Sequence, residues 1–304
     1  MVAPNTLSFD QHVVIVTGAG SGLGREYALQ FARRGAHVVV NGRSPENISE
    51  TVETIRANAG SAIPCVVDVA TQDAGERVIS AAIDEWGRID ALVNNAGVGH
   101  PGAPGSFSMA DFEAELAVSL KASVTLSVAA WPHLSRAGAG RIVNTSSSTI
   151  FGTPGSLPYT SAKAAIIGLT RGLAIDGAEA GIRANAVMPL ASTPMNTSLP
   201  NQEVSRQFRE HFPVEKAAAL ILLLAHEAAP ATGETFITGG GFSARVSLVL
   251  GSGVVSEESS PESLLGCFDE LMSSAGGSAP TQSGRVREQI IDILRDNATS
   301  SADD

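Results

Sequence analysis

Tyr159 and Lys163 are the residues whose types and spacing most directly indicate acid–base chemistry. They stand four apart at the start of a helical pattern that runs to about Gly181, and side chains at this spacing share one face of a helix. A free phenol has a pKa of about 10, and a neighbouring ammonium lowers it by favouring the phenolate. We therefore predict that Lys163 lowers the pKa of Tyr159 and makes it a usable acid and base. Taken alone, this spacing is most often an ordinary surface pair, so the argument depends on where the fold places it.

A cluster of serines follows the apolar stretch Arg141–Asn144, ahead of the Tyr159 helix. The stretch predicts a buried strand, whose end lies close to the start of the next helix. A hydroxyl at that point could bind a substrate carbonyl oxygen and the alkoxide that develops from it. An ordinary polar loop is the alternative. We expect one of three side chains to face the site, namely Ser146, Ser147 or Ser148.

The segment Thr17–Gly24 is a glycine-rich loop between a predicted strand, Val13–Val16, and a predicted helix, Arg25–Arg34. Glycines allow a tight turn and a close approach of the backbone to a pyrophosphate, and the helix N-terminus attracts the anion. A plain glycine-rich turn is the alternative, which the position directly after the first strand disfavours. The predicted dinucleotide contacts in this loop are Gly18, Gly20, Ser21, Gly22, Leu23 and Gly24.

Further strand ends complete the predicted dinucleotide cleft. The second strand ends in Gly42-Arg43-Ser44, with no carboxylate for the ribose of NAD, whereas the Arg43 guanidinium suits a 2′-phosphate. This favours NADP and keeps NAD as the second choice; a solvated loop charge is the alternative for Arg43. Asp68 could bind the adenine amino group or cap a helix near Thr71. The remaining predicted contacts are Val69 and, after the fourth strand, Asn95, Ala96 and Gly97.

These segments belong to a regular alternation of strands and helices. The alternation predicts an α/β fold of the Rossmann type, a doubly wound parallel sheet with helices on both faces. We expect it to occupy residues 1–245 and to be followed by a C-terminal extension, 246–304. The extension should hold a short strand within Ser243–Val255, helices at Ser259–Met272 and Arg285–Arg295, and a frayed tail. The sheet strands are expected at Val13–Val16, His37–Val40, Ile63–Val69, Ala91–Val93, Arg141–Asn144, Arg183–Val187 and Thr235–Ile237.

Composition restricts the classes of function. A formal net charge of -11 argues against a nucleic-acid surface and an anionic membrane surface. The most apolar stretch, Ala217–Ala225, is far shorter than the ~20 residues that cross a bilayer, and no signal-peptide pattern is visible. Cys65 and Cys267 are too few and too far apart for a disulfide framework, which suits a reducing compartment. We expect a cytoplasmic protein, and no metal site because the histidines lack metal-ligand spacing.

Jointly, these motifs resemble the short-chain dehydrogenase/reductase family over about residues 13–242. The resemblance implies a Rossmann fold, hydride transfer between a nicotinamide and a substrate carbon, a tyrosine acid/base, a lysine that holds the ribose, and a homotetramer or dimer. It also implies cofactor contacts from Pro189 and Thr193. It rests on Thr17–Gly24, Asn94–Gly97, the serine cluster, Tyr159–Lys163, Pro189 and Thr193.

Within the family, three stretches look like the 3-hydroxyacyl-CoA dehydrogenase unit of multifunctional β-oxidation enzymes and its bacterial relatives. These are Gly22–Leu29, Ala130–His133, and Thr232–Glu234 leading to Gly239–Val246. The resemblance implies a 3-hydroxyacyl or 3-oxoacyl substrate, or another hydrophobic carbonyl compound. The loops 99–105, 149–158 and 191–212 are expected to form its pocket.

Some positions depart from the family pattern. Ser119 stands where the family usually has an asparagine that holds a water in a proton relay, and it is therefore a further candidate catalytic residue. Leu190 replaces a common glycine, and Asn41-Gly42-Arg43 replaces the Asn-Asp of NAD-using hydroxyacyl-CoA relatives. The family spacing counted from the strand selects Ser147 as the catalytic serine, and the spacing counted back from Tyr159 selects Ser146. We prefer Ser147, because a strand end fixes position better than a loop.

We therefore predict an NAD(P)(H)-dependent oxidoreductase that interconverts a secondary alcohol and a ketone. The substrate oxygen would lie between Ser147 and Tyr159, while Lys163 bonds the nicotinamide ribose. A non-catalytic NADP-binding sensor or scaffold of the same fold is the first alternative. An isomerase or dehydratase that uses the cofactor transiently is the second, without a motif of its own.

Overall fold

The structure is a computed structural model of the 304-residue chain. It describes residues 7–193, 202–256, 258 and 260–300. The chain divides into two compact units, Met1–Arg245 and Val246–Asp304. The first unit carries the predicted site.

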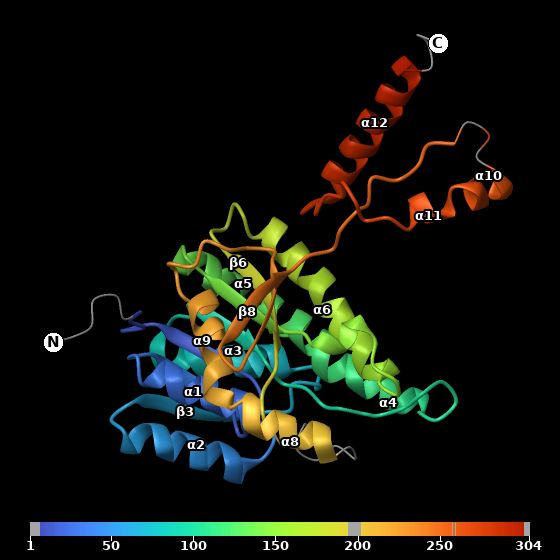
Figure 1. Cartoon of the computed structure of the whole chain (residues 1–304). Helices are drawn as coiled ribbons and strands as arrows, with labels where there is room; N and C mark the ends of the chain where they lie inside the picture. The colour runs from blue at the N-terminus through green and yellow to red at the C-terminus, as the bar shows by residue number, and fades with distance from the viewer. Residues whose placement is uncertain (1–6, 194–201, 257, 259, 301–304) are drawn as a thin grey trace. The chain divides into compact units, whose positions relative to one another are not determined.

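The first unit is built on a sheet whose strand order turns back at its centre (Figure 1). The order is β3-β2-β1-β4-β5-β6-β7-β8, and neighbours from β3 through β7 pair in parallel. This order confirms the predicted doubly wound α/β fold, in which ligands bind beyond the carboxyl ends of the strands at the reversal, here β1 and β4. The strands are β1 (Val13–Val16), β2 (His37–Gly42), β3 (Ser61–Val66), β4 (Ala91–Asn94), β5 (Arg141–Thr145), β6 (Arg183–Pro189), β7 (Thr235–Gly239) and β8 (Phe242–Val246).

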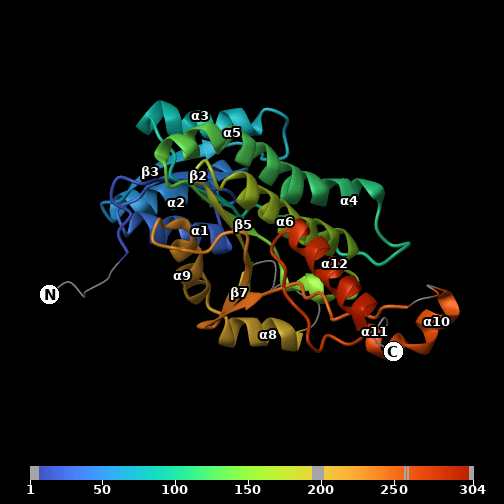
Figure 2. The same ribbon diagram turned by 90° about the horizontal axis from the view of Figure 1, so that it is seen from above.

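Helices cover both faces of the sheet, which is why β1 is a continuous run of buried β-branched residues. Seen from above in Figure 2, α3, α5 and α6 lie on one side of the strands, and α1 and α9 lie on the other. Each side has its own core. Tyr27, Phe31 and Leu222 belong to one, and Leu92 and Ile142 to the other. These helices are α1 (Gly22–Ala32), α3 (Ala74–Trp86), α5 (Ala122–Ala137), α6 (Leu157–Asp176) and α9 (Val214–Ala225), and α2 (Pro45–Ala57) follows β2.

A helical run from Met109 to Ala137 changes its winding midway. It consists of α4 (Met109–Glu115), the π-helical segment η1 (Leu116–Lys121) and α5 (Ala122–Ala137). By length and composition alone it could cross a membrane. Its apolar residues, such as Leu126 and Ala130, instead pack in the core beside α3. Packing in the α/β fold therefore accounts for its apolar character.

Most predicted strands extend one or two residues further in the structure, and the first helix is Gly22–Ala32 rather than Arg25–Arg34. Two other elements also differ at their boundaries. The third strand is Ser61–Val66 rather than Ile63–Val69, because the chain leaves the sheet where the Asn41 side chain bonds the carbonyls of Cys65 and Val67. The Tyr159 helix ends at Asp176 rather than near Gly181, since the chain turns there. Neither difference moves a predicted site residue out of its strand end or helix start.

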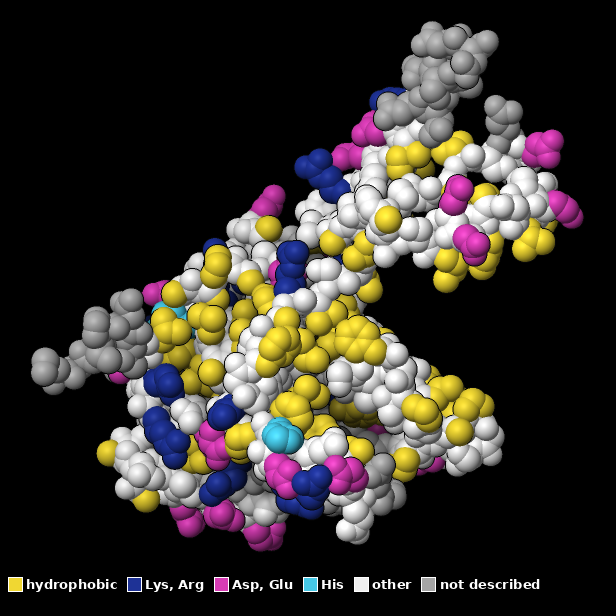
Figure 3. Space-filling model, viewed as in Figure 1, with side chains coloured by type: hydrophobic (Ala, Val, Ile, Leu, Met, Phe, Trp, Pro, Cys, Tyr) yellow, Lys and Arg dark blue, Asp and Glu magenta, His cyan; other side chains and the backbone are white. Residues whose placement is uncertain are grey.

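The second unit consists of short helices and connecting segments. The predicted helix Ser259–Met272 is interrupted at Cys267, which is not helical, and the last helix is longer than predicted at both ends. Figure 3 shows hydrophobic side chains gathered on the surface of this unit; they include Leu265, Phe268 and Met272, at 74%, 50% and 70% exposure. Its helices are α10 (Pro261–Gly266), α11 (Phe268–Leu271) and α12 (Ser283–Ser300).

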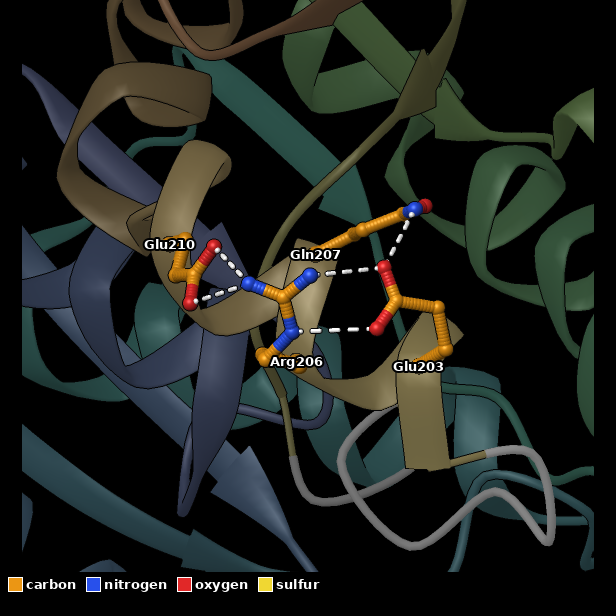
Figure 4. A network of polar contacts seen from close by, with 4 residues as sticks. All are labelled: Glu203, Arg206, Gln207 and Glu210. Carbon is orange, nitrogen blue, oxygen red and sulfur yellow. Dashed lines mark hydrogen bonds and ion pairs between the residues drawn. The ribbon is translucent and has the colours of Figure 1, made fainter.

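The exposed helix α8 (Gln202–His211) follows directly after the undescribed segment 194–201. Arg206 lies between two carboxylates (Figure 4), donating to Glu203 at 2.7 and 3.0 Å and to Glu210 at 2.9 Å. Gln207 donates to Glu203 at 3.0 Å. Pairs of opposite charge three and four residues apart favour a helix modestly when they are exposed to solvent. They stabilise one end of the loop that is expected to border the substrate.

Candidate active site

The glycine-rich loop after β1 has the cradle shape that a pyrophosphate needs. Gly18 and Gly22 have φ of 66° and 54°, a region that favours glycine. A Cβ on Gly24 would lie 2.2 Å from the carbonyl oxygen of Gly18 and 2.5 Å from Nδ2 of Asn95. The backbone of the loop is therefore packed so closely that only glycine fits at position 24, and its approach to a pyrophosphate stays a prediction.

The start of α1 presents donors to the same space. Ser21 is its N-cap residue in an extended conformation, its side chain makes no capping hydrogen bond, and the first turn carries no acidic residue. The first N–H groups of a helix have no partner within the helix. Those of Gly22, Leu23 and Gly24 are thus placed to receive an anion, as predicted.

Thr17 joins this loop to the end of β4. Its hydroxyl accepts hydrogen bonds from the N–H groups of Asn95 and Ala96 at 2.9 and 3.0 Å, and Asn95 Nδ2 donates to the Thr17 carbonyl at 2.9 Å. These bonds fix the two sides of the sheet reversal to each other. Thr17 was predicted as part of the loop, but this positioning role was not predicted.

Replacing Gly24 with alanine is expected to distort the loop. Because the new Cβ would meet backbone atoms, we expect a loss of ~1–3 kcal/mol in the free energy of unfolding and at least tenfold weaker dinucleotide binding. Urea unfolding and fluorescence titration measure the two effects. Gly172→Ala in α6 is the control, since nothing lies within 4 Å of its added Cβ. Unchanged dinucleotide affinity in Gly24→Ala would contradict the role of the loop.

Arg43 and Asp68 lie at the ends of β2 and β3 and face each other, with 3.9 Å between Nη1 and Oδ2. Both are well exposed, so a ligand can reach them. Asp68 also accepts from the N–H of Ala70 at 2.9 Å. It caps this turn rather than a helix, because α3 begins only at Ala74.

The other residues predicted at this edge have mainly structural contacts. Ser44 is the N-cap of α2, and its hydroxyl accepts from the Asn47 N–H at 3.3 Å. Val69 is buried, and a Cβ on Gly42 would lie 2.9 Å from Ile48. They form the edge of the predicted adenosine site.

Gly97 links the cofactor loop to the predicted catalytic lysine. A Cβ on Gly97 would lie 3.5 Å from Nζ of Lys163. Asn95, Ala96 and Gly97 therefore pass between the glycine-rich loop and α6. The space next to this segment is where a nicotinamide ribose could meet both.

Tyr159 and Lys163 lie in the first turns of α6 and are adjacent, as predicted. Nζ of Lys163 is 5.5 Å from the centroid of the Tyr159 ring. The lysine is 2% exposed, and its ammonium donates to the carbonyl of Thr145, the last residue of β5, at 3.0 Å. The strand end thus holds the ammonium beside the ring.

A lowered pKa was predicted for Tyr159, and this prediction is wrong as far as the surrounding protein groups are concerned: they raise it. Burial raises the pKa of Tyr159, a hydrogen bond with the Ser147 side chain lowers it in part, and the Glu115 carboxylate raises it further. Burial also lowers the pKa of Lys163 from 10.5 to about 8, although Glu115 opposes this change. Burial is the largest cause for both groups, because it disfavours each charged form.

The structure separates the two candidate serines. Ser147 is half-buried, bonds the Tyr159 hydroxyl and accepts from the N–H of Thr149 at 3.2 Å. Ser146 points the opposite way: it is buried and donates to the carbonyl of Lys163 at 2.8 Å. The assignment of Ser146 as a catalytic candidate is corrected, since its hydroxyl anchors α6 to the strand end. Ser148 begins the short helix η2 (Ser148–Phe151).

Buried amides beneath the site were not predicted. Asn94 donates to Oδ1 of Asn144 at 2.8 Å, and Asn144 donates to Thr170 in α6 at 3.0 Å. This network connects β4, β5 and α6 and so fixes the helix that carries Tyr159. Their position at the ends of neighbouring parallel strands was the available signal.

Two further residues of the helical run lie beside the site. Ser119, in η1, is 2% exposed, and its hydroxyl has no hydrogen-bond partner among the described residues. Glu115, which the sequence analysis missed, is fully buried. π-helical segments occur often at functional sites, and η1 packs against α6.

The remaining predicted contacts come after β6. Pro189 ends β6, and Leu190 donates to the Thr238 carbonyl at 2.7 Å. Thr193 is the last residue described before a gap. Of the expected 191–212 loop, residues 194–201, ahead of α8, therefore lie outside the described residues. Among the residues that the structure covers, no three His, Cys, Asp or Glu side chains gather as a metal site. The absence of a metal site from the whole chain stays a prediction.

Comparison with known proteins decides the family. The short chain dehydrogenase model matches residues 12–204. The chain belongs to this family. Membership confirms the resemblance drawn from the motifs, and the fit of the glycine-rich cradle agrees with the NAD(P)(H) that the family binds.

Relatives of the chain include complete short-chain dehydrogenases and parts of larger proteins. It is 34% identical to peroxisomal multifunctional enzyme A of Dictyostelium discoideum over 95% of this chain and 65% of that protein. It is 36% identical to the (2S)-[(R)-hydroxy(phenyl)methyl]succinyl-CoA dehydrogenase subunit BbsD of Thauera aromatica, over 77% and 98% of the two chains. The chain therefore spans less than two thirds of the first relative's length.

A solved structure with a bound ligand has the same fold. It is a 7α-hydroxysteroid dehydrogenase complexed with NADH and 7-oxo glycochenodeoxycholic acid, with a TM-score of 0.73 and 29% identity. The alignment covers 79% of this chain and 98% of that one.

Proposed function

We propose that the chain is an NAD(P)(H)-dependent oxidoreductase that interconverts a secondary alcohol and a ketone. The observation that carries this proposal is that Ser147, Tyr159 and Lys163 lie together. They lie beside the segment Asn95–Gly97, which follows β4 and contacts the glycine-rich loop. An acid/base and a hydroxyl donor at the carboxyl edge of a dinucleotide-binding sheet are the groups that carbonyl reduction needs. Family membership supports the same reaction class.

In the proposed reaction the bound nicotinamide supplies or accepts the hydride. Ser147 and Tyr159 hold the substrate oxygen, and Tyr159 donates a proton to it in reduction or removes one in oxidation. Lys163 binds the nicotinamide ribose and places a positive charge near the phenol. The non-catalytic sensor requires none of these contacts, so their presence favours the enzyme.

For the substrate we propose a 3-oxoacyl or 3-hydroxyacyl thioester. A relative's name specifies a CoA thioester. Two of the expected substrate loops meet at a bridge between Gly102 and Ser156, where Gly102 N–H donates to Gly155 at 2.7 Å. Phe151 and Leu157, exposed at 66% and 39%, offer apolar surface on one of them.

An assay with acetoacetyl-CoA and either NADH or NADPH tests this proposal. We expect loss of the reduced-cofactor absorbance with one of them, and the reverse reaction with 3-hydroxybutyryl-CoA. A panel of other ketones is assayed in parallel. Turnover of one of them, without turnover of acetoacetyl-CoA, would show that the substrate class is wrong and the reaction class is right. Cofactor binding without turnover on any ketone would favour the sensor instead.

We further propose NADP as the preferred cofactor. Arg43 is exposed at the end of β2, where a 2′-phosphate would lie, and it faces Asp68 at 3.9 Å. An ion pair this long between exposed groups contributes little, so Arg43 can turn to a phosphate at little cost. Asp68 is the competing group, because its carboxylate would bind a ribose hydroxyl and repel the phosphate.

Arg43→Ala is expected to weaken NADP binding by about ten- to a hundredfold, the ~1.5–3 kcal/mol of a charged hydrogen bond. NAD affinity should change less than twofold. Titration calorimetry with both dinucleotides measures the difference, and Arg77→Ala, an exposed arginine of α3, is the control. Equal losses for NAD and NADP would show that Arg43 does not read the phosphate.

We also propose that the protein is a homo-oligomer located in the cytoplasm. The exposed apolar side chains of the second unit support a homo-oligomer in which this unit packs against another copy. The free cysteines Cys65 and Cys267 suit the reducing cytoplasm. The small-molecule substrate and the acidic net charge leave no role for nucleic acid or a membrane surface.

A further inference from the structure

Glu115 is a fully buried carboxylate that the proposed reaction does not use. Its Oε1 accepts from the His100 N–H at 2.6 Å and lies 3.1 Å from Nδ1 of the same residue. Its Oε2 is buried and has no hydrogen-bond partner among the described residues. A buried carboxylate with one unsatisfied oxygen is costly and calls for an explanation.

A second buried oxygen on the same helical run also lacks a partner among the described residues. It is the hydroxyl of Ser119, which stands four residues further along the chain than Glu115. Both α4 and η1 pack against α6, the helix of Tyr159 and Lys163. A water held by two such buried oxygens is the usual way in which polar groups of this kind are satisfied.

The charge of Glu115 reaches the catalytic pair. Burial raises the pKa of Glu115, the hydrogen bonds from the His100 backbone and side chain lower it in part, and the charge of Lys163 lowers it further. In return, its carboxylate raises the pKa values of both Tyr159 and Lys163. The titratable groups that face Glu115 are His100 from the loop after β4 and the Tyr159–Lys163 pair from α6. On the same helix as Glu115, Asp111 has its pKa lowered mainly by hydrogen bonds from Ser108, with a small contribution from His100.

His100 connects this interior to solvent. Its side chain is 35% exposed, whereas that of Glu115 is 0% exposed. The imidazole is the side chain best suited to exchange protons near neutral pH. Glu115 thus bonds an accessible ring on one side, and on the other it is coupled electrostatically to Lys163, whose side chain is 2% exposed.

We propose that Glu115 is a positioning residue of this site that carries protons between the Tyr159–Lys163 pair and solvent through His100. The proton-carrying part of this inference rests on the proposed oxidoreductase function. It requires no group beyond those named and water.

In oxidation, the positive charge of the bound oxidised nicotinamide favours the Tyr159 phenolate against the effect of burial. The phenolate takes the hydroxyl proton of the alcohol, while the hydride leaves the alcohol carbon for the oxidised cofactor. Lys163 passes a proton toward Glu115 and regains one from Tyr159. Glu115 passes its proton to His100, and the ring releases it to water. Alcohol and oxidised cofactor thus give ketone, reduced cofactor and one solvent proton, and every side chain returns to its starting state.

The first test needs neither substrate nor cofactor. The lysines of the chain are Lys121, Lys163 and Lys216, so carbon-13 lysine NMR resolves Lys163, assigned by its loss in Lys163→Met. The parent should titrate near its pKa of about 8. Glu115→Gln should move the Lys163 midpoint to lower pH, because the carboxylate that favours the ammonium is gone. Glu113→Gln, an exposed acid on the same helix, should leave it unchanged.

The second test measures turnover of the substrate found in the ketone panel. Glu115→Gln should lower kcat about tenfold with KM within twofold, and the solvent deuterium isotope effect on kcat should rise as proton release becomes limiting. Glu115→Asp, which keeps a carboxylate, should recover part of the loss. Glu113→Gln should match the parent.

The two tests distinguish the coupling of Glu115 to Lys163 from its proton-carrying role and from the proposed oxidoreductase function. An unchanged Lys163 midpoint in folded Glu115→Gln overturns the proposal, whatever the substrate. A shifted midpoint with kcat and isotope effect at parental values overturns the proton-carrying role. If the parent reduces no ketone, the proposed function fails, while the Lys163 midpoint still decides whether Glu115 is coupled to the pair. Circular dichroism and dinucleotide binding confirm that each variant is folded.

Discussion

Replacing Tyr159 with phenylalanine is expected to lower kcat by ~10³-fold or more, because the proton donor and acceptor of the reaction is removed. Dinucleotide affinity should stay within about twofold, since the glycine-rich loop and Lys163 are untouched. Initial rates with the active ketone and a separate binding titration measure the two effects. Loss of activity with retained binding is the signature of a group that acts in the transition state.

Tyr27→Phe is the matched control for this variant. Tyr27 is the chain's other tyrosine; it lies in the core, and its hydroxyl has no hydrogen-bond partner among the described residues. Removing that oxygen should leave turnover at the parental rate. A Tyr159→Phe protein within tenfold of the parent would contradict the assignment of Tyr159.

Lys163→Met is expected to lower kcat by about a hundredfold and to weaken dinucleotide binding, because it removes the buried ammonium beside Tyr159. The same change should stabilise the fold by ~1–3 kcal/mol at pH 7, since a buried charge gives way to an apolar side chain of similar length. Rates, binding titrations and urea unfolding separate the three effects. Lys216→Met on α9 is the control, with activity unchanged.

The gain in stability should depend on pH in a defined direction. The pKa of Lys163 falls from 10.5 to about 8 on folding, so between these values the unfolded chain binds more protons than the folded one. The stability of the parent should therefore rise from about pH 8 toward 10.5. The gain in the free energy of unfolding from Lys163→Met should be complete below about pH 8 and absent above pH 10.5, the pKa of Lys163 in the unfolded chain. A constant difference across this range would contradict the buried charge.

Spacing made the main parts of the site predictable. The position of Thr17–Gly24 directly after a buried strand determines a loop at a helix N-terminus. Residues four apart in a helix must be neighbours, which placed Tyr159 beside Lys163. These inferences depend on local geometry, which the sequence encodes directly.

Other features depend on tertiary structure and could not be predicted. Successive residues of an extended segment point in opposite directions, so one position decides between Ser146, which binds the α6 backbone, and Ser147, which faces Tyr159. The net pKa of Tyr159 depends on burial, which spacing does not report. Glu115 looks like an exposed acid of a polar helix, and only the packing of α4 and η1 on α6 places it in the interior.

The central claim is that Ser147, Tyr159 and Lys163 promote direct hydride transfer between substrate carbon and nicotinamide. A substrate alcohol deuterated at its carbinol carbon, incubated with the enzyme and the oxidised dinucleotide, tests it most directly by NMR of the recovered cofactor. Deuterium is expected at C4 of the nicotinamide with the parent, and essentially none with Tyr159→Phe. Reduced cofactor that carries no deuterium, or equal labelling by both proteins, would contradict it.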